Sequence, residues 1–279
     1  MSDPRCRPEI VRLRHGIRTW YLPPDQSLAG MEAAVAQPGD VLKESHKTRV
    51  RRVGDWVVKE SRAPWPAAMA KHTFRRSRYR QGWLAAHFLA AHGVGVAAPM
   101  AYAEDGFGGI LLGNVLVSRH LADCVNVQAY LHKLIARHAS PAVFTAFFAA
   151  LAEAVNHLTG TGAYHSDLAG KNILTQDGRT FYFIDLDAVV LSSEYTAARR
   201  LRNHVQLYSS FCTSVSDHLL TPFIVRMLPG SIDPRVWMPQ VRAGQRDRRA
   251  HSIKRRQKQG LPSLHNDGGE HRAGGVGKN

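Results

Sequence analysis

The chain has little cysteine and no long apolar run. Only three of its 279 residues are cysteines, and Cys6, Cys124 and Cys212 are too far apart for a disulfide ladder or a metal-binding motif. We therefore expect free thiols in a reducing compartment. No run of about 18 consecutive apolar residues occurs, and the first residues lack the apolar core of a secretion signal. These absences predict a cytoplasmic protein that is either soluble or peripheral on a membrane.

Acidic side chains are also scarce. The 37 Lys and Arg residues against 22 Asp and Glu residues give a net charge of +15. This charge favours anionic partners such as nucleotides, phosphorylated glycolipids, membrane surfaces or nucleic acids. Basic residues are densest after Val241, and glycines follow them toward the end of the chain. We predict that residues 242–279 form a disordered basic tail. The tail either only aids solubility or, on the sharper interpretation, binds anionic lipid, to which each nearby basic residue contributes about 1 kcal/mol.

The chain does contain a compact set of polar residues between apolar segments. His165 and Asp167 begin an H-x-D-x-x-x-x-N motif that ends at Asn172, and a later apolar strand ends at Asp185. Phosphoryl transfer from ATP needs one carboxylate for the attacking hydroxyl, and an amide and a second carboxylate for Mg²⁺. An Asp-Gly turn at 177–178 predicts a hairpin that places Asn172 beside Asp185. Reading the carboxylates as ordinary turn and strand-end residues leaves their joint spacing unexplained.

With these motifs the chain resembles the protein-kinase-like superfamily. Within it, the bacterial lipopolysaccharide core kinases (Kdo and heptose kinases) share the H-x-D-L-x-x-x-N-I-L loop and the I-D-x-D strand. The resemblance extends from about Val41 to about Val215. It implies an α+β, two-lobed protein-kinase-like fold with a small β-rich N-lobe and a mainly helical C-lobe. It also implies ATP and Mg²⁺ as cofactors.

The resemblance divides the chain into four parts. These are an N-terminal flap (1–40), an N-lobe of strands plus one helix (41–121), a C-lobe with the catalytic loop (122–241), and the basic tail (242–279). The 44% hydrophobic content is sufficient for a substantial core. Alternating and β-branched residues predict three strands between Val41 and Lys59, and an apolar stripe predicts a helix over 77–92. A Gly-Asn pair at 113–114 predicts a turn between two further strands.

The resemblance also implies roles for individual residues. Asp167 would orient the acceptor hydroxyl and accept its proton, and Lys171 would stabilise charge on the transferred phosphoryl group. Asn172 and Asp185 would bind Mg²⁺. Lys59 ends a V-V-K strand similar to the V-A-I-K strand whose lysine holds the donor phosphates.

Parts of the protein-kinase pattern are absent. No G-x-G-x-x-G covers the phosphates, and we predict that Ser45, Lys47 and Thr48 on the first hairpin bind them instead. Beyond Asp187 there is no A-P-E element.

The helix after the strand lysine also lacks the glutamate that pairs with it in related kinases. The corresponding stretch reads R-Q-G-W, in which Gln81 can hydrogen-bond to Lys59 but cannot neutralise it. A carboxylate from elsewhere, Glu60 or Asp185, would have to hold the lysine. Asp187 is either a structural acceptor or a second carboxylate for the metal.

We therefore predict an ATP- and Mg²⁺-dependent kinase that phosphorylates a sugar hydroxyl of the lipopolysaccharide inner core (Kdo or heptose). Its partners would be the lipopolysaccharide core or a lipid A precursor, and the anionic inner leaflet at the cytoplasmic face of the inner membrane. Specific nucleic-acid binding would explain the charge but would leave the catalytic loop without a purpose. Two alternatives stay open: an aminoglycoside-type small-molecule phosphotransferase and a non-catalytic, nucleotide-binding pseudokinase. The oligomeric state is open as well.

Overall fold

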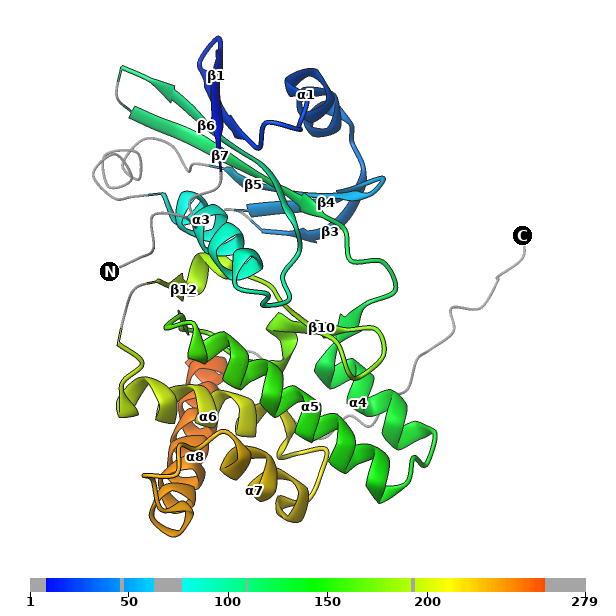
Figure 1. The fold of residues 1–279 in the computed structure, drawn as a ribbon, viewed down its shortest axis with the longest axis vertical. Coiled ribbons are helices and arrows are strands. Elements are labelled where there is room, and N and C mark those ends of the chain that lie inside the picture. The colour runs from blue at the N-terminus through cyan, green and yellow to red at the C-terminus, as the bar shows by residue number, and fades with distance from the viewer. Residues whose placement is uncertain (1–8, 46–47, 63–76, 109, 192–193, 259–279) are drawn as a thin grey trace.

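The computed structural model describes residues 9–45, 48–62, 77–108, 110–191 and 194–258, which form two lobes (Figure 1). In the described part of the N-lobe, a seven-stranded antiparallel sheet has the order β1-β2-β6-β7-β5-β4-β3. Its elements in chain order are β1 (Val11–His15), β2 (Arg18–Leu22), α1 (Leu28–Ala36), β3 (Asp40–Glu44), β4 (Thr48–Val53), β5 (Trp56–Arg62), α3 (Arg78–Ala91), β6 (Pro99–Phe107) and β7 (Ile110–Arg119). The predicted two-lobed α+β architecture is confirmed.

The N-lobe sheet is covered by a helix on each face. Successive residues of a strand point to opposite faces, so Ala101 packs with Met31 of α1, whereas Tyr102 packs with Trp83 of α3. Ser77 begins α3 by accepting a hydrogen bond from the Arg80 backbone amide. The predicted helix over 77–92 and the three predicted strands are therefore present, with boundaries shifted by a few residues.

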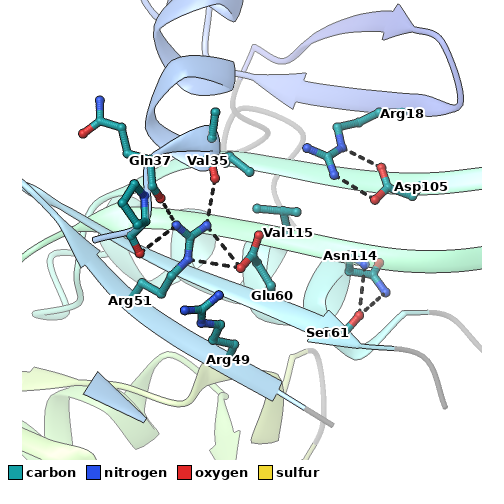
Figure 2. Close-up of a pocket in the computed structure, with 12 residues that line it drawn as sticks. Arg18, Val35, Gln37, Arg49, Arg51, Glu60, Ser61, Asp105, Asn114 and Val115 are labelled. Atoms are coloured by element: carbon teal, nitrogen blue, oxygen red, sulfur yellow. Dashed lines mark hydrogen bonds and ion pairs between the residues drawn. The ribbon is translucent and has the colours of Figure 1, made fainter. Parts of the chain in front are cut away.

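The prediction of a separate N-terminal flap over residues 1–40 is wrong for the part that the structure describes. β1 and β2 extend the sheet through pairing of β2 with β6, and α1 covers one face of it. The guanidinium of Arg51, only 4% exposed, binds the C-terminal end of α1 by donating to the carbonyls of Val35, Gln37 and Pro38. It also pairs with Glu60, so this buried charge is fully partnered (Figure 2).

A cavity of about 410 Å³ lies between α1 and the sheet. Its polar lining is largely internally paired: Arg18 donates to both carboxylate oxygens of Asp105 at 2.6 and 2.8 Å, and Arg51 binds Glu60 (Figure 2). All the residues that line it belong to the N-lobe. These pairs hold α1 and β2 on the sheet, and we assign the cavity no role in the chemistry.

The predicted turn at residues 113–114 is also wrong. β7 runs through this Gly-Asn pair without interruption, and the last pair of residues between β6 and β7 is Phe107 with Ile110. Asn114 is tolerated inside the strand because its side chain is satisfied there. It accepts hydrogen bonds from Ser77 and Tyr102, each at 2.8 Å.

The C-lobe is mainly helical, with short strands that carry the polar motifs. Its elements are β8 (Val125–Asn126), α4 (Val127–Ala136), α5 (Pro141–Gly160), β9 (Tyr164–His165), η2 (Gly170–Asn172), β10 (Ile173–Thr175), β11 (Phe181–Phe183), η3 (Leu186–Ala188), β12 (Val189–Val190), α6 (Ala197–Phe211), α7 (Asp217–Arg226) and α8 (Pro234–Lys258). Phe148 of α5 packs against Phe211 and Phe223 at the centre of the lobe.

Helix α5 is long and apolar enough to cross a membrane, and no other helix in the described ranges has these properties. Its buried side chains nevertheless lie in the C-lobe core: Phe147, Phe148, Leu151 and Val155 are each at most 3% exposed. The core helix of a globular lobe meets the same length and composition criteria, and we interpret α5 in this way.

The prediction of a disordered tail from residue 242 onward is wrong up to residue 258. α8 continues to Lys258, and its first half packs on the C-lobe through the buried Trp237 and Val241. The Trp237 indole donates to Nδ1 of the buried His204, and Arg242 pairs with Asp217 at 2.6 Å. The apolar residues of α8 that pack on the C-lobe lie beside many basic residues, so the composition alone predicted disorder. Residues 259–279 lie outside the described part of the chain.

Candidate active site

The catalytic loop follows β9 and is braced by His165 from within the C-lobe. The Nδ1 atom of His165 accepts a hydrogen bond from the Asp167 backbone amide at 3.2 Å, and its Nε2 atom lies 3.0 Å from the Ile184 carbonyl. This pattern requires a neutral ring that carries its proton on Nε2. Burial lowers the pKa of His165, which agrees with the neutral form. His165 thus ties the catalytic loop to the strand that leads to Asp185.

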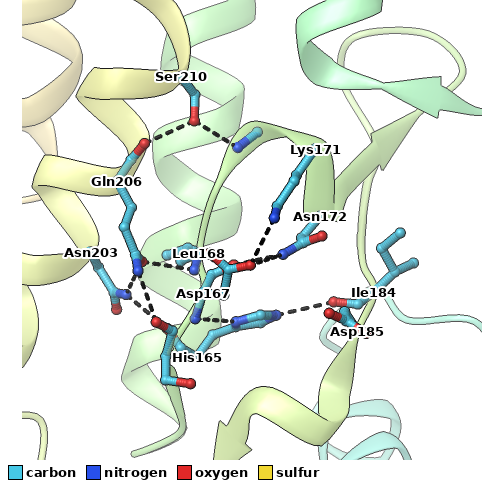
Figure 3. Close-up of polar contacts among 12 residues, drawn as sticks. His165, Asp167, Leu168, Lys171, Asn172, Ile184, Asp185, Asn203, Gln206 and Ser210 are labelled. Atoms are coloured by element: carbon cyan, nitrogen blue, oxygen red, sulfur yellow. Dashed lines mark hydrogen bonds and ion pairs between the residues drawn. The ribbon is translucent and has the colours of Figure 1, made fainter. Parts of the chain in front are cut away.

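Helix α6 holds the same loop from the other side (Figure 3). Gln206 donates to the Ser166 carbonyl and accepts from the Leu168 amide, both at 2.8 Å. Asn203 donates to the His165 carbonyl at 2.8 Å, and Ser210 accepts from the Gly170 amide at 2.9 Å. These α6 side chains therefore satisfy backbone groups of a loop that has no regular pairing of its own.

Asp167 is partly exposed and has two partners from its own loop. Lys171 lies 3.1 Å from its Oδ2 atom, and the Asn172 amide donates to the same atom at 3.0 Å and to the Asp167 carbonyl at 2.8 Å. Burial raises the pKa of Asp167, but the Lys171 and Asn172 contacts outweigh it, so the net shift is downward. Asp167 is therefore ionised at neutral pH.

The predicted hairpin brings Asn172 and Asp185 together. β10 and β11 pair antiparallel, and the Ile184 amide donates to the Asn172 carbonyl at 3.0 Å. Asp185 follows with φ of 61° and ψ of 44°, a left-handed conformation that Asp tolerates better than most residues. This conformation ends the strand and begins η3.

Lys59 on β5 reaches across from the N-lobe to this turn. Its Nζ atom lies 2.8 Å from Oδ1 of Asp185 and 3.2 Å from Oδ1 of Asp187. Burial alone would lower the pKa of Lys59, but the charges of Asp187 and Asp185 produce a net increase. Burial likewise opposes ionisation of Asp185, and the Lys59 ammonium lowers its pKa to about 2. For Asp187, burial and the neighbouring Asp185 charge raise the pKa.

The proposed substitutes for the missing helix glutamate are only partly as predicted. Asp185 does contact Lys59, whereas Glu60 binds Arg51 instead. Gln81 does not reach Lys59, because its side chain donates to the Val189 carbonyl at 2.7 Å. Asp187, which the sequence left as a structural or metal-side residue, is the second carboxylate on the lysine.

The residues predicted to bind donor phosphates lie at the β3–β4 turn. The Ser45 amide donates to the Thr48 carbonyl at 2.8 Å, and the Thr48 amide donates to the Ser45 hydroxyl at 3.1 Å. Lys47 lies outside the described residues. Tyr79 of α3 connects the turn to Lys59: its hydroxyl lies 3.4 Å from Thr48 Oγ1, and its ring centroid is 5.4 Å from the lysine Nζ.

The oxygen atoms at the cleft suit Mg²⁺, which typically binds one or two carboxylates together with substrate phosphates. Asp185 is ionised, and the amide oxygen of Asn172 points away from Asp167 (Figure 3). Within the described residues, no group of three or more His, Cys, Asp or Glu could hold a metal ion. With one carboxylate and one amide oxygen, Asp185 and Asn172 could hold a cation that takes its remaining ligands from phosphate oxygens.

The α6 residues are functional positions that the sequence reasoning missed. Asn203, Gln206 and Ser210 of α6 carry the contacts to the loop. Their signal was present: three polar residues at spacings of three and four occupy one helical face, and that face is buried. Buried polar residues on such a face indicate a partner with unpaired backbone groups.

Curated proteins show no match at the sequence level. Among solved structures, WaaP in complex with acyl carrier protein aligns with a TM-score of 0.60 and 20% identity, over 80% of this chain and 92% of that chain. The bifunctional kinase-methyltransferase WbdD aligns with a TM-score of 0.45 and 16% identity, over 93% of this chain and 51% of that chain.

A family model gives the decisive comparison. The model of the lipopolysaccharide kinase (Kdo/WaaP) family matches residues 33–221, a span that contains Lys59, Asp167, Asn172 and Asp185. The match covers more than half of the chain. The protein therefore belongs to the lipopolysaccharide kinase (Kdo/WaaP) family and is a kinase of lipopolysaccharide sugars.

Proposed function

We propose that the protein transfers the γ-phosphoryl group of ATP, with Mg²⁺, to a hydroxyl of Kdo or heptose in the lipopolysaccharide inner core. The residue assignment rests on how the four proposed site residues lie together. Asp167, Asn172 and Asp185 lie on one loop and hairpin of the C-lobe, and Lys59 reaches the same hairpin from the N-lobe. Family membership supports the acceptor class.

On the acceptor side, Asp167 is the proposed base. Its lowered pKa keeps the carboxylate free to accept a hydrogen bond from the attacking hydroxyl. The proton passes to Asp167 as the acceptor oxygen bonds to the γ-phosphorus, while the bond from that phosphorus to the β–γ bridging oxygen breaks and ADP leaves. Lys171 stays 3.1 Å from Asp167 and stabilises negative charge on the transferred group.

On the donor side, Lys59 is proposed to hold the α- and β-phosphates, and Ser45, Lys47 and Thr48 to line the phosphate loop. Asn172 and Asp185 would hold Mg²⁺, which neutralises charge on the donor phosphates when it is bound. The pseudokinase alternative rested on a lysine without a carboxylate partner, and the two carboxylates beside Lys59 remove that argument.

We also propose that a negatively charged group of the acceptor binds beside α8. Gly244 of α8 packs so closely on Val205 that a Cβ there would lie 2.7 Å from a valine methyl group, and Gln245 contacts Cys212. Arg248 follows one turn later, near the catalytic loop. Burial raises the pKa of Asp167, and its contacts with Lys171 and Asn172 lower it. The Arg248 charge lowers this pKa further. An acceptor phosphate or carboxylate beside the reacting hydroxyl would fit this position.

The remaining basic residues of α8 support a proposed peripheral location on the cytoplasmic face of the inner membrane. Arg246, Arg249 and Lys254 of α8 are exposed. Truncation after Lys258 combined with Arg249→Glu should weaken binding to vesicles that contain phosphatidylglycerol, more so at low salt. Unchanged vesicle binding would contradict the membrane assignment.

Incubation of the protein with radiolabelled ATP and separated lipopolysaccharide, protein and small-molecule fractions tests the main proposal. We expect Mg²⁺-dependent label in the lipopolysaccharide fraction and its loss in Asp185→Asn, with little change in the unfolding midpoint. Label only in the small-molecule fraction would instead favour the aminoglycoside-type alternative. Normal turnover by Asp185→Asn would contradict the metal assignment.

A further inference from the structure

Helix α3 has a glycine where it passes over the turn that carries the metal-side carboxylates. A Cβ atom on Gly82 would lie 3.0 Å from the backbone nitrogen of Asp187 and 3.3 Å from its Cα atom. Backbone atoms cannot move aside as a flexible side chain can, so a larger residue at position 82 would push α3 away from η3. The segment of α3 that lacks the glutamate of related kinases is therefore also the segment that approaches η3 closely.

Asp187 occupies the space beside Lys59 that this approach creates. Its carboxylate lies 3.2 Å from the lysine Nζ atom, and its side chain is 22% exposed, whereas that of Asp185 is 45% exposed. Gln81 fixes the same arrangement by donating to the Val189 carbonyl, directly after η3. Helix and turn are therefore docked by the close approach of Gly82 to Asp187 and by the hydrogen bond from Gln81 to Val189.

We propose that Asp187 is the residue that positions Lys59, in place of a helix glutamate, and that Gly82 permits it to do so. The inference rests on the proposed function, in which Asp185 binds the cation. A carboxylate engaged by Mg²⁺ cannot also serve as the full partner of the lysine, so Asp187 remains to orient the ammonium toward the phosphates. The I-D-L-D sequence at 184–187 then supplies both the cation ligand, Asp185, and the lysine partner, Asp187, from one turn.

Pairing with Asp187 makes the position of Lys59 depend on both lobes. A glutamate on α3 would pair with Lys59 inside the N-lobe, whereas Asp187 belongs to the C-lobe, so the pair joins the two lobes. Lys59 is consequently in place only when the lobes are closed on each other. Displacement of α3 relative to the sheet would act on the lysine through the contact of α3 with η3 and through the Tyr79 ring beside the lysine Nζ atom.

A double-mutant cycle on the full chain tests the proposal, and its nucleotide-binding measurement needs no acceptor. The measurements are the affinity for Mg²⁺ with the non-hydrolysable analogue AMPPNP, by calorimetry, and the Mg²⁺ concentration at half-maximal transfer. Asp187→Asn should weaken AMPPNP binding several-fold and lower transfer by about tenfold or more, because the ammonium loses its orientation. The Mg²⁺ requirement should stay unchanged, and Asp187→Glu should retain more transfer than Asp187→Asn. In a Lys59→Ala background, Asp187→Asn should add nothing.

Three results would overturn the proposal: wild-type behaviour of Asp187→Asn, effects that add to those of Lys59→Ala, or a shift in the Mg²⁺ requirement like that of Asp185→Asn. The last would make Asp187 a metal ligand. Gly82→Ala should reproduce a weaker form of the Asp187→Asn defect. Gly160→Ala is the matched control, since a Cβ in that helix meets nothing within 4 Å. If the wild type transfers to no lipopolysaccharide, the proposed function fails, but the AMPPNP cycle still decides the role of Asp187.

Discussion

The catalytic loop and the lysine that faces it are held in different ways. Backbone groups of the loop are bound by buried side chains of α6 and by His165, all within the C-lobe. Lys59 depends instead on carboxylates that belong to the other lobe. The acceptor side of the site is therefore built into one folded unit, whereas the donor side is complete only when both lobes come together. Changes on the two sides should accordingly have different effects on stability and activity.

The largest expected effect is on the acceptor side. Asp167→Asn removes the base but keeps the shape and the contact with Lys171, so transfer should fall by about 10²–10⁴-fold. The unfolding midpoint should change little. Rates of phosphate transfer to lipopolysaccharide and a thermal unfolding curve measure both. Glu153→Gln, which removes an exposed pair with Arg226, is the control. A variant that keeps near-wild-type transfer would contradict the role of Asp167.

Breaking the α6 contact should affect stability and activity together. Gln206→Ala leaves the Leu168 amide and the Ser166 carbonyl without partners, which costs about 1–3 kcal/mol of unfolding free energy for each buried group. Urea unfolding and transfer rates should both register the change. Gln240→Ala is the control, because that side chain bonds only within α8. Loss of stability with unchanged transfer would mean that the loop keeps its shape without α6.

The pH dependence of stability should report on the contact between α6 and α8. Burial and the Arg200 charge lower the pKa of His204 to about 3 in the folded protein. The contribution of His204 to the unfolding free energy is fully present above the pKa of about 6.5 that histidine has in the unfolded chain. It declines below that pH, because only the unfolded chain then binds a proton at this residue. The unfolding free energy should fall by about 2 kcal/mol between pH 7 and pH 5 from this residue alone.

The test is chemical unfolding at several pH values. His204→Asn keeps an acceptor for the Trp237 indole and should flatten this part of the pH profile. The exposed His251 provides the control, since His251→Asn should leave the profile unchanged. An identical slope in His204→Asn and the wild type would show that another group titrates.

The smallest expected effect concerns the acceptor's charge. Arg248→Gln should raise the KM for lipopolysaccharide by roughly fivefold, about 1 kcal/mol for a solvent-accessible ionic contact, while kcat changes less. Arg246→Gln is the control, because Arg246 lies on the opposite face of α8. Dephosphorylated and carboxyl-reduced acceptors distinguish the two possible anions. Equal KM values for both variants would remove Arg248 from the acceptor site.

Several local features could be predicted because their cause is local. The Asp-Gly turn, the alternation in β4 and β5, and the stripe on α3 each depend on neighbouring residues, and all three are present. The failures arose where tertiary packing outweighed the local signal. The Gly-Asn pair at 113–114 stays in a strand because Asn114 finds side-chain partners there. The basic run after Val241 stays helical as the continuation of α8, whose first half is anchored on the C-lobe by the buried Trp237 and Val241.

The sequence alone determined the chemistry of this protein, since the spacing of Asp167, Asn172 and Asp185 along one loop and hairpin already specified a kinase-type site. Only the tertiary structure decided what holds these groups. The carboxylate beside Lys59 lies 128 residues away in the chain, at Asp187, and the side chains that brace the loop come from a helix 38–40 residues further on. Such partners are selected by backbone approach and burial, which depend on how whole elements pack and leave no fixed spacing in the sequence.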